Sequence, residues 1–224
     1  MLNEKVWIVI PAHNEAKNIA NVLQQLAVLP AKVVVVDDDS ADETARIAIG
    51  FPVYLLKHLV NRGQGAALQT GTEFALRHGA EVIVHFDADG QMQTKDIAKV
   101  IEPILNKQAD IVFGSRFLSG DSKIPWTKKY FILLPAKIFN WVFTGVHLTD
   151  AHCGFRALSA KAARAIEIRQ DGMAHATEIM DQVRLLNLRY QEVPVEIIYH
   201  EYGQSFGKGF KILVDLIIGR LTKK

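Results

Sequence analysis

Short apolar runs rich in β-branched residues alternate with helical patterns in the first half of the chain, and this alternation constrains the fold most strongly. The runs cover residues 5–10, 32–40, 52–58, 81–90 and 109–117. Helical patterns end near Ala27 and then cover 41–49, 63–79 and 94–106. Strands that are apolar on both faces and separated by helices form a mostly parallel sheet covered on both sides. We therefore expect a Rossmann-like α/β fold.

The composition excludes several classes of protein. The formal net charge is only +2 over 224 residues, so no strong positive field favours nucleic acid. Cys153 is the single cysteine, which excludes an internal disulfide. We find no signal peptide at the N-terminus and no run of about 20 apolar residues that would span a membrane. We expect a cytoplasmic protein with, at most, peripheral membrane contact.

Polar residues follow each of the five predicted strands. In open parallel sheets, ligands bind beyond the carboxyl ends of the strands, so these residues should line one edge. The glycine turn that begins with "NRGQGAAL" would let the backbone, at Gly65 in particular, approach a ligand closely. The polar strand ends are Pro11–Glu15, Asp37–Asp39, Asn61–Gly65, Asp87–Gln91 and Gly114–Arg116.

The pair Asp87 and Asp89 is the strongest chemical signal among these strand ends. In a strand, alternate side chains share a face, which would place the two carboxylates about 7 Å apart along the backbone. Such close acids repel each other, and a divalent cation removes the conflict. Carboxylate oxygens suit Mg²⁺ or Mn²⁺, and Gln91 would add an amide oxygen. A solvated acidic turn is the plain alternative.

The second half of the chain follows a different pattern. The segment 130–148 is apolar, helical patterns cover 159–167 and 175–187, and a strand is expected over 190–200. Residues 206–224 form an amphipathic helical pattern, so we divide the chain into a domain 1–205 and a C-terminal helix 206–224. The apolar surfaces would pack on the sheet, on a second subunit in a homodimer, or against a membrane or membrane partner.

Five motifs in register resemble family 2 glycosyltransferases, and within that family the dolichyl- or polyprenyl-phosphate sugar transferases. They are "VIPAHNEAKNI", "VVVVDDDSADET", "NRGQGAALQTG", "DADGQ" and "GSRF", and the similarity extends over about residues 5–205. The resemblance implies a GT-A fold, a Rossmann-like sheet that binds a nucleotide-diphospho-sugar. In the polyprenyl branch the donor would be a GDP- or UDP-sugar and the acceptor a lipid phosphate at the membrane surface.

The resemblance also implies roles for individual residues. The first loop would touch the nucleoside, the "VDD" positions would contact base and ribose, and the D-x-D with the following glutamine would hold Mg²⁺ or Mn²⁺. Two arginines would lie near the phosphates and the transferring sugar, where a planar guanidinium pairs well with phosphate oxygens. In chain order these residues are Pro11, His13, Glu15, Val36, Asp38, Asp87, Ala88, Asp89, Gln91, Arg116 and Arg156.

The catalytic base departs from the family pattern. Members that glycosylate a hydroxyl often carry the pair Glu-Asp, whereas "HATEIMD" has Glu178 followed by Ile179. An ionised phosphate acceptor needs no base, so this departure favours a polyprenyl phosphate. Glu178 remains a candidate base, or a residue that caps or faces a helix. The alternatives are transfer to a saccharide hydroxyl and an inactive nucleotide-binding or regulatory module.

Overall fold

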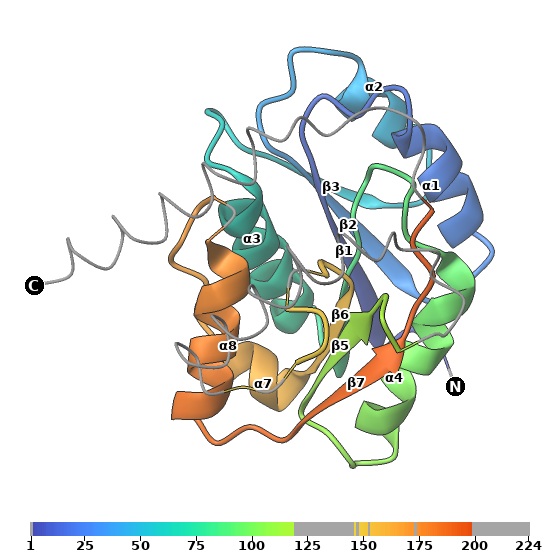
Figure 1. The fold of residues 1–224 in the computed structure, drawn as a ribbon. Helices are drawn as coiled ribbons and strands as arrows, with labels where there is room; N and C mark the ends of the chain where they lie inside the picture. The colour runs from blue at the N-terminus through green and yellow to red at the C-terminus, as the bar shows by residue number, and fades with distance from the viewer. Residues whose placement is uncertain (1, 119–145, 147, 152, 173, 199–224) are drawn as a thin grey trace, which may run out of the picture.

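The computed structural model describes residues 2–118, 146, 148–151, 153–172 and 174–198, and Figure 1 shows their arrangement. The strands are β1 (Val6–Ala12), β2 (Lys32–Asp37), β3 (Tyr54–Lys57), β4 (Val82–His85), β5 (Ile111–Ser115), β6 (Arg156–Ser159) and β7 (Tyr190–Pro194). The helices are α1 (Ile19–Leu26), α2 (Thr44–Ala48), α3 (Gln64–Arg77), the 3₁₀ turn η1 (Thr94–Asp96), α4 (Ile97–Leu105), α7 (Ala160–Ala165) and α8 (His175–Leu185).

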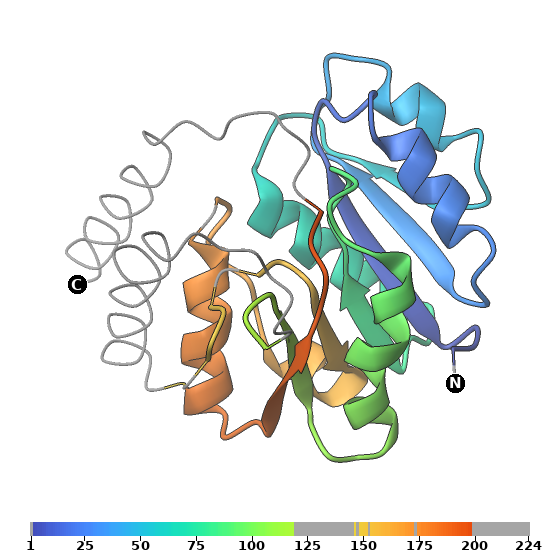
Figure 2. The same cartoon turned by 45° about the vertical axis from the view of Figure 1, so that its right-hand side comes forward.

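The seven strands form one sheet in the order β3-β2-β1-β4-β6-β5-β7. All neighbouring strands run parallel except β6, which is antiparallel to both β4 and β5. One apolar cluster packs α1, α2 and α4 on one face, and a second packs α3, α7 and α8 on the other, as Figure 2 shows. The predicted mostly parallel sheet with helices on both faces is therefore confirmed.

Strand β6 was not predicted, because the sequence around it indicated a turn followed by a helix. The segment Arg156–Ser159 contains no β-branched residue and begins with a charged side chain, so it carries little strand propensity of its own. Its position is set by hydrogen bonding to β4 on one side and β5 on the other. The predicted helix then begins at Ala160, where the Ser159 hydroxyl accepts a hydrogen bond from the Ala162 N–H at 3.1 Å.

Two predicted surfaces lie wholly or mostly outside the described residues. The amphipathic pattern 206–224 lies entirely outside them, and so does most of the apolar segment 130–148. Their packing on the sheet, a second subunit or a membrane stays a prediction, as does the domain boundary at residue 205. Within the part of the chain that the structure describes, no helix is long and apolar enough to cross a membrane.

Helix α3 lies unusually close to the sheet at Gly71. A Cβ atom added there would lie 2.4 Å from Val9 Cγ1 and 3.1 Å from Val36 Cγ2. Both valines are fully buried, so neither can move toward solvent to make room. The close contact fixes the height of α3 above β1 and β2, and with it the position of the helix N-terminus at the sheet edge.

Gly71→Ala should therefore destabilise the protein. Overpacking costs about 1–3 kcal/mol, and the higher helix propensity of alanine returns about 1 kcal/mol. The 2.4 Å approach to buried Val9 places the cost at the upper end of this range, so we expect a net fall of about 2 kcal/mol in the free energy of unfolding, measured by urea denaturation. Gly172→Ala is the matched control, because a Cβ atom there meets no atom within 4 Å. Equal stability of the two variants would contradict the packing argument.

Candidate active site

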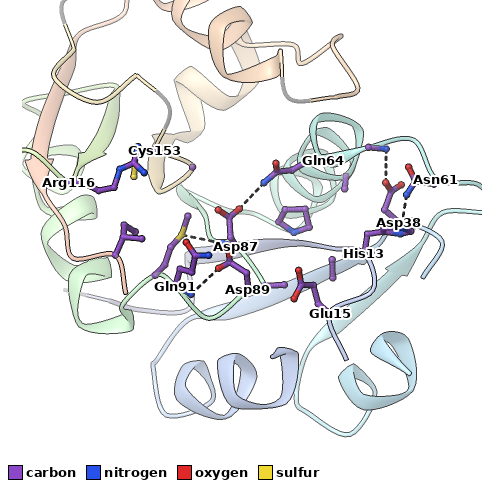
Figure 3. A pocket seen from close by; sticks show the side chains of 18 residues that line it. His13, Glu15, Asp38, Asn61, Gln64, Asp87, Asp89, Gln91, Arg116 and Cys153 are labelled. Carbon is purple, nitrogen blue, oxygen red and sulfur yellow. Dashed lines mark hydrogen bonds between the residues drawn. The ribbon is translucent and has the colours of Figure 1, made fainter. Parts of the chain in front are cut away.

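The polar residues that follow the strands meet at one cavity of about 650 Å³, shown in Figure 3. The structure confirms that the carboxyl ends of β1, β2, β4 and β5 share one edge of the sheet, because β6 alone runs against them. Nine residues that the sequence singled out line this cavity. They are Pro11, His13, Glu15, Asp38, Asp87, Ala88, Asp89, Gln91 and Arg116.

Four other predicted site residues do not line the cavity. Val36 is fully buried in the core beneath α3, and buried Gly65 packs against the loop that contains Gln170 and Asp171. Arg156 is only 2% exposed and lies behind the cavity wall. The carboxylate of Glu178 is held by backbone N–H groups outside the cavity. The roles predicted for these four residues stay predictions, and none of the four is among the described residues that line this cavity.

Asp38 organises the loop at one end of the cavity. One carboxylate oxygen accepts hydrogen bonds from His58 Nδ1 at 2.6 Å and from the Arg62 N–H at 2.9 Å, and the other accepts from the Gly63 N–H at 2.6 Å. Burial alone would raise the pKa of Asp38, but these hydrogen bonds hold it below its usual value. Thr70 in turn contacts His58 Nε2 at 3.0 Å. Asp38 is therefore an ionised anchor for the loop after β3.

His13 lies beside this anchor and connects the ends of β1 and β2. Its Nδ1 is 2.9 Å from the Asp38 carbonyl oxygen, a contact that needs a proton on that nitrogen. Its Nε2 lies 2.9 Å from the Asn14 amide, and the Asn61 amide approaches the ring from the loop after β3. Asn14 adopts a left-handed φ of 57° that allows this turn. Three strand ends are thus joined at one end of the cavity.

The paired acids lie in a turn and not in the strand that the sequence predicted. Strand β4 ends at His85, and the turn after it is permitted by Gly90 with φ of 76°. Asp87 Oδ1 accepts a hydrogen bond from Gln64 Nε2 at 2.9 Å, and Asp89 Oδ1 accepts one from the Gln91 N–H at 2.9 Å. The spacing of the two acids therefore comes from turn geometry and from α3, which carries Gln64.

The electrostatics of this turn favour a bound cation. Burial, together with the negative charge of Asp89, raises the pKa of Asp87 to about 6. Burial and Asp89 also raise the pKa of Glu15. Among the described residues, no three His, Cys, Asp or Glu side chains are placed to hold a metal by themselves. Such a site fits an ion that takes two protein carboxylates and completes its shell with amide, water or phosphate oxygens.

Arg116 brings positive charge to the cavity and is held by Asp150, which was not among the predicted site residues. Asp150 is buried and accepts two hydrogen bonds from the guanidinium of Arg116. Nε donates to Oδ2 at 2.5 Å and Nη2 donates to Oδ1 at 2.7 Å. Asp150 itself is fixed by its N–H, which donates to Glu192 Oε1 at 3.1 Å. The planar fork of Arg116 is therefore oriented before any ligand binds.

Arg156 lies behind Asp87 as a buried positive charge. Its Nη2 donates to the Cys153 carbonyl at 3.3 Å, while Nε and Nη1 have no hydrogen-bond partner in the described part of the chain. The guanidinium counteracts the upward shift in the pKa of Asp87. It also lowers the pKa of His85 and His175, although burial is the larger cause for both. Arg156 therefore acts on the cavity through its charge, from outside the lining.

Several lining residues were missed because only the folded chain brings them to the cavity. Met92, Gly154 and Ile197 join the lining from the turn after β4, the segment before β6 and the segment after β7. Gln64 belongs to the predicted strand end Asn61–Gly65, but its contact with Asp87 was not predicted. Cys153 also lines the cavity, and burial, followed by the charge of Asp150, raises its pKa to about 12. A buried thiol with so high a pKa is a packed residue and not a nucleophile.

The sequence matches the model of glycosyl transferase family 2 over residues 7–167, and the chain belongs to that family and is a glycosyltransferase. One relative is the UDP-N-acetylglucosamine–dolichyl-phosphate N-acetylglucosaminyltransferase of Methanococcus voltae, 32% identical over 100% of this chain and 99% of its own. Another is the undecaprenyl-phosphate mannosyltransferase of Micrococcus luteus, 31% identical over 90% of this chain and 86% of its own.

Solved structures show the same fold. Glucosyl-3-phosphoglycerate synthase from Mycobacterium tuberculosis, in complex with Mn²⁺, UDP and glucosyl-3-phosphoglycerate, superposes with a TM-score of 0.71. The match covers 95% of this chain and 77% of that one at 17% sequence identity. At this identity the likeness establishes the GT-A fold, and the predicted fold class is confirmed.

Gly154 offers the first test of the site, because its backbone lies close to the side chain of Asp87. An added Cβ atom would lie 2.7 Å from Asp87 Oδ2 and 3.2 Å from Met92 Cε. We expect Gly154→Ala to displace the carboxylate and to weaken binding of a nucleoside diphosphate with Mn²⁺ by about 10- to 100-fold, measured by calorimetry. The Gly172→Ala control should bind like the wild type. Unchanged affinity in Gly154→Ala would contradict the placement of Asp87.

Proposed function

We propose that the protein is an inverting, metal-dependent transferase that moves a sugar from a nucleotide-diphospho-sugar to a polyprenyl phosphate. The observation that carries the proposal is the order of groups along the cavity. In Figure 3 the acids Asp87 and Asp89 lie between Arg116 on one side and the His13–Asp38 end on the other. This order suits a nucleoside at the His13–Asp38 end, a diphosphate over the acids and the sugar toward Arg116.

Asp87, Asp89 and Gln91 would hold a Mg²⁺ or Mn²⁺ ion together with the diphosphate. Two carboxylates and an amide leave room for phosphate oxygens, which is how Mg²⁺ is usually bound beside nucleotides. The ion would neutralise the charge that develops on the leaving diphosphate. The raised pKa of Asp87 and its proximity to Asp89 support this role, because a cation is what relieves the repulsion. Glucosyl-3-phosphoglycerate synthase, which shares this fold, was solved in complex with Mn²⁺ and UDP, and this supports the same role.

Arg116 would bind phosphate oxygens near the transferring sugar. Asp150 holds the guanidinium plane, so the donor groups are oriented in advance and lose little entropy on binding. Among the lining residues of the described chain, Arg116 is the one arginine or lysine. The acceptor phosphate and the leaving diphosphate both carry negative charge, and this arginine would lower the repulsion between them.

The acceptor is proposed to be a phosphate because no base is needed to ionise it. Three of the four cavity carboxylates have another task in the proposal: Asp38 anchors its loop, while Asp87 and Asp89 hold the metal. The fourth, Glu15, accepts a hydrogen bond from Asn18 Nδ2 at 2.9 Å. Glu178 is held outside the cavity. The relatives named for dolichyl-phosphate and undecaprenyl-phosphate transfer support the same class of acceptor. Such a lipid would be met at a membrane surface, with peripheral contact by this chain.

The nucleotide and metal dependence can be tested by thermal stability. UDP and GDP should be compared, each with and without Mn²⁺. A ligand at about 100 times its dissociation constant adds about 2.7 kcal/mol of stability. We expect a shift with one of the two nucleotides that requires Mn²⁺ and disappears in Asp89→Asn. Stabilisation by neither nucleotide would contradict the proposed donor site, and stabilisation that survives Asp89→Asn would contradict the proposed metal site.

The acceptor class can be tested by comparing a short-chain polyprenyl phosphate with the matching polyprenol. The two lipids differ only in the phosphate, so membrane affinity is nearly matched. With the donor identified by stability, we expect sugar transfer to the phosphate and at least about 100-fold less to the alcohol, because an alcohol needs general-base help. Comparable transfer to both, or to a saccharide hydroxyl instead, would contradict the phosphate acceptor.

A further inference from the structure

The loop 167–172 lies between α8 and the N-terminus of α3, and Glu178 fixes it from the α8 side. One carboxylate oxygen, Oε2, accepts hydrogen bonds from the Arg169 N–H at 2.9 Å and the Gln170 N–H at 2.8 Å. Buried His175, one turn earlier on α8, places Nδ1 2.8 Å from the Gly172 carbonyl oxygen. Two side chains of one helix thus determine the path of the loop backbone.

The same loop also contacts the N-terminus of α3. The Gly65 N–H donates to the Asp171 carbonyl at 2.7 Å, which satisfies one of the donors left open at a helix N-terminus. A Cβ atom added at Gly65 would lie 2.0 Å from the Gln170 carbonyl oxygen. One added at Gly63, where φ is 96°, would lie 2.4 Å from the Asp171 carbonyl oxygen. The glycines of "NRGQG" therefore serve contact with this loop.

Gln64 lies between those two glycines and reaches the cavity. Its Nε2 donates to Asp87 Oδ1 at 2.9 Å. The position of Asp87 thus depends on Gln64, the position of Gln64 on the Gly63–Gly65 turn, and the position of that turn on the loop that Glu178 holds. The contacts form a continuous path of hydrogen bonds and packed backbone from α8 to the candidate metal site.

We propose that Glu178 is a positioning residue, which sets the N-terminus of α3 and through Gln64 the carboxylate of Asp87, and that it takes no proton from the acceptor. The engaged Oε2 and the place of Glu178 outside the cavity lining carry this inference. Its catalytic part rests on the proposed function, whereas the structural path from Glu178 to Gln64 does not.

Two substitutions of the same residue separate a positioning role from a base. In Glu178→Gln the amide oxygen still accepts both N–H groups, so we expect kcat, its pH profile and nucleotide affinity to stay within about threefold of the wild type. A lost general base costs about 10²- to 10⁴-fold in rate. In Glu178→Ala both hydrogen bonds are lost, and we expect affinity for the nucleoside diphosphate with Mn²⁺ to fall by about 10- to 100-fold.

Hydrogen exchange without any ligand tests the path independently of transferase activity. We expect amides in 62–68 to exchange at least about tenfold faster in Glu178→Ala than in the wild type, and at the wild-type rate in Glu178→Gln. Gly65→Ala disturbs the same contact from the α3 side, because the added Cβ atom would lie 2.0 Å from the Gln170 carbonyl oxygen, so it should show the same acceleration. Gly172→Ala and the exposed Arg184→Ala on α8 are controls that should exchange normally.

The outcomes separate this inference from the proposed function. A rate loss above 100-fold in Glu178→Gln, with normal exchange and normal nucleotide binding, would make Glu178 a base and overturn the inference. Normal exchange in Glu178→Ala would overturn it as well. If the wild type turned over no nucleotide sugar while Glu178→Ala still accelerated exchange in 62–68, the proposed function would fail and the positioning path would stand.

Discussion

The repulsion between Asp87 and Asp89 is the constraint around which the cavity is arranged. Two carboxylates in one turn, with Glu15 nearby, are costly to bury, and burial raises the pKa of Asp87 to about 6. Several groups of different kinds stabilise the two carboxylates. Gln64 donates to Asp87, the Gln91 N–H donates to Asp89, and Arg156 supplies positive charge from behind the wall. A divalent cation with a diphosphate would complete this balance.

The geometry of these supports depends on close backbone contacts. A side chain at Gly71 would push α3 away from the sheet, one at Gly65 would push it away from the loop 167–172, and one at Gly154 would strike Asp87. Each contact limits one direction in which the acids or their partners could move. Preorganisation of this kind is what allows charged groups to stabilise a developing charge without rearranging during the reaction.

The fold and part of the site could be predicted because their signals are local. Valine-rich runs followed by acids place Asp38, Asp87 and Asp89 at strand ends, and the sheet then brings them together. Asp150 and Gln64 could not be predicted this way, because their partners lie 34 and 23 residues away and meet only through the strand order. Strand β6 was missed because its pairing, not its composition, makes it a strand.

The most direct test of the account is anomalous diffraction from a crystal grown with Mn²⁺ and the nucleoside diphosphate that stabilises the protein. We expect a manganese peak about 2.1 Å from carboxylate oxygens of Asp87 and Asp89, with the diphosphate on the ion and the nucleobase at the His13–Asp38 end. A peak away from both acids, or a nucleobase bound at the Arg116 end, would contradict it.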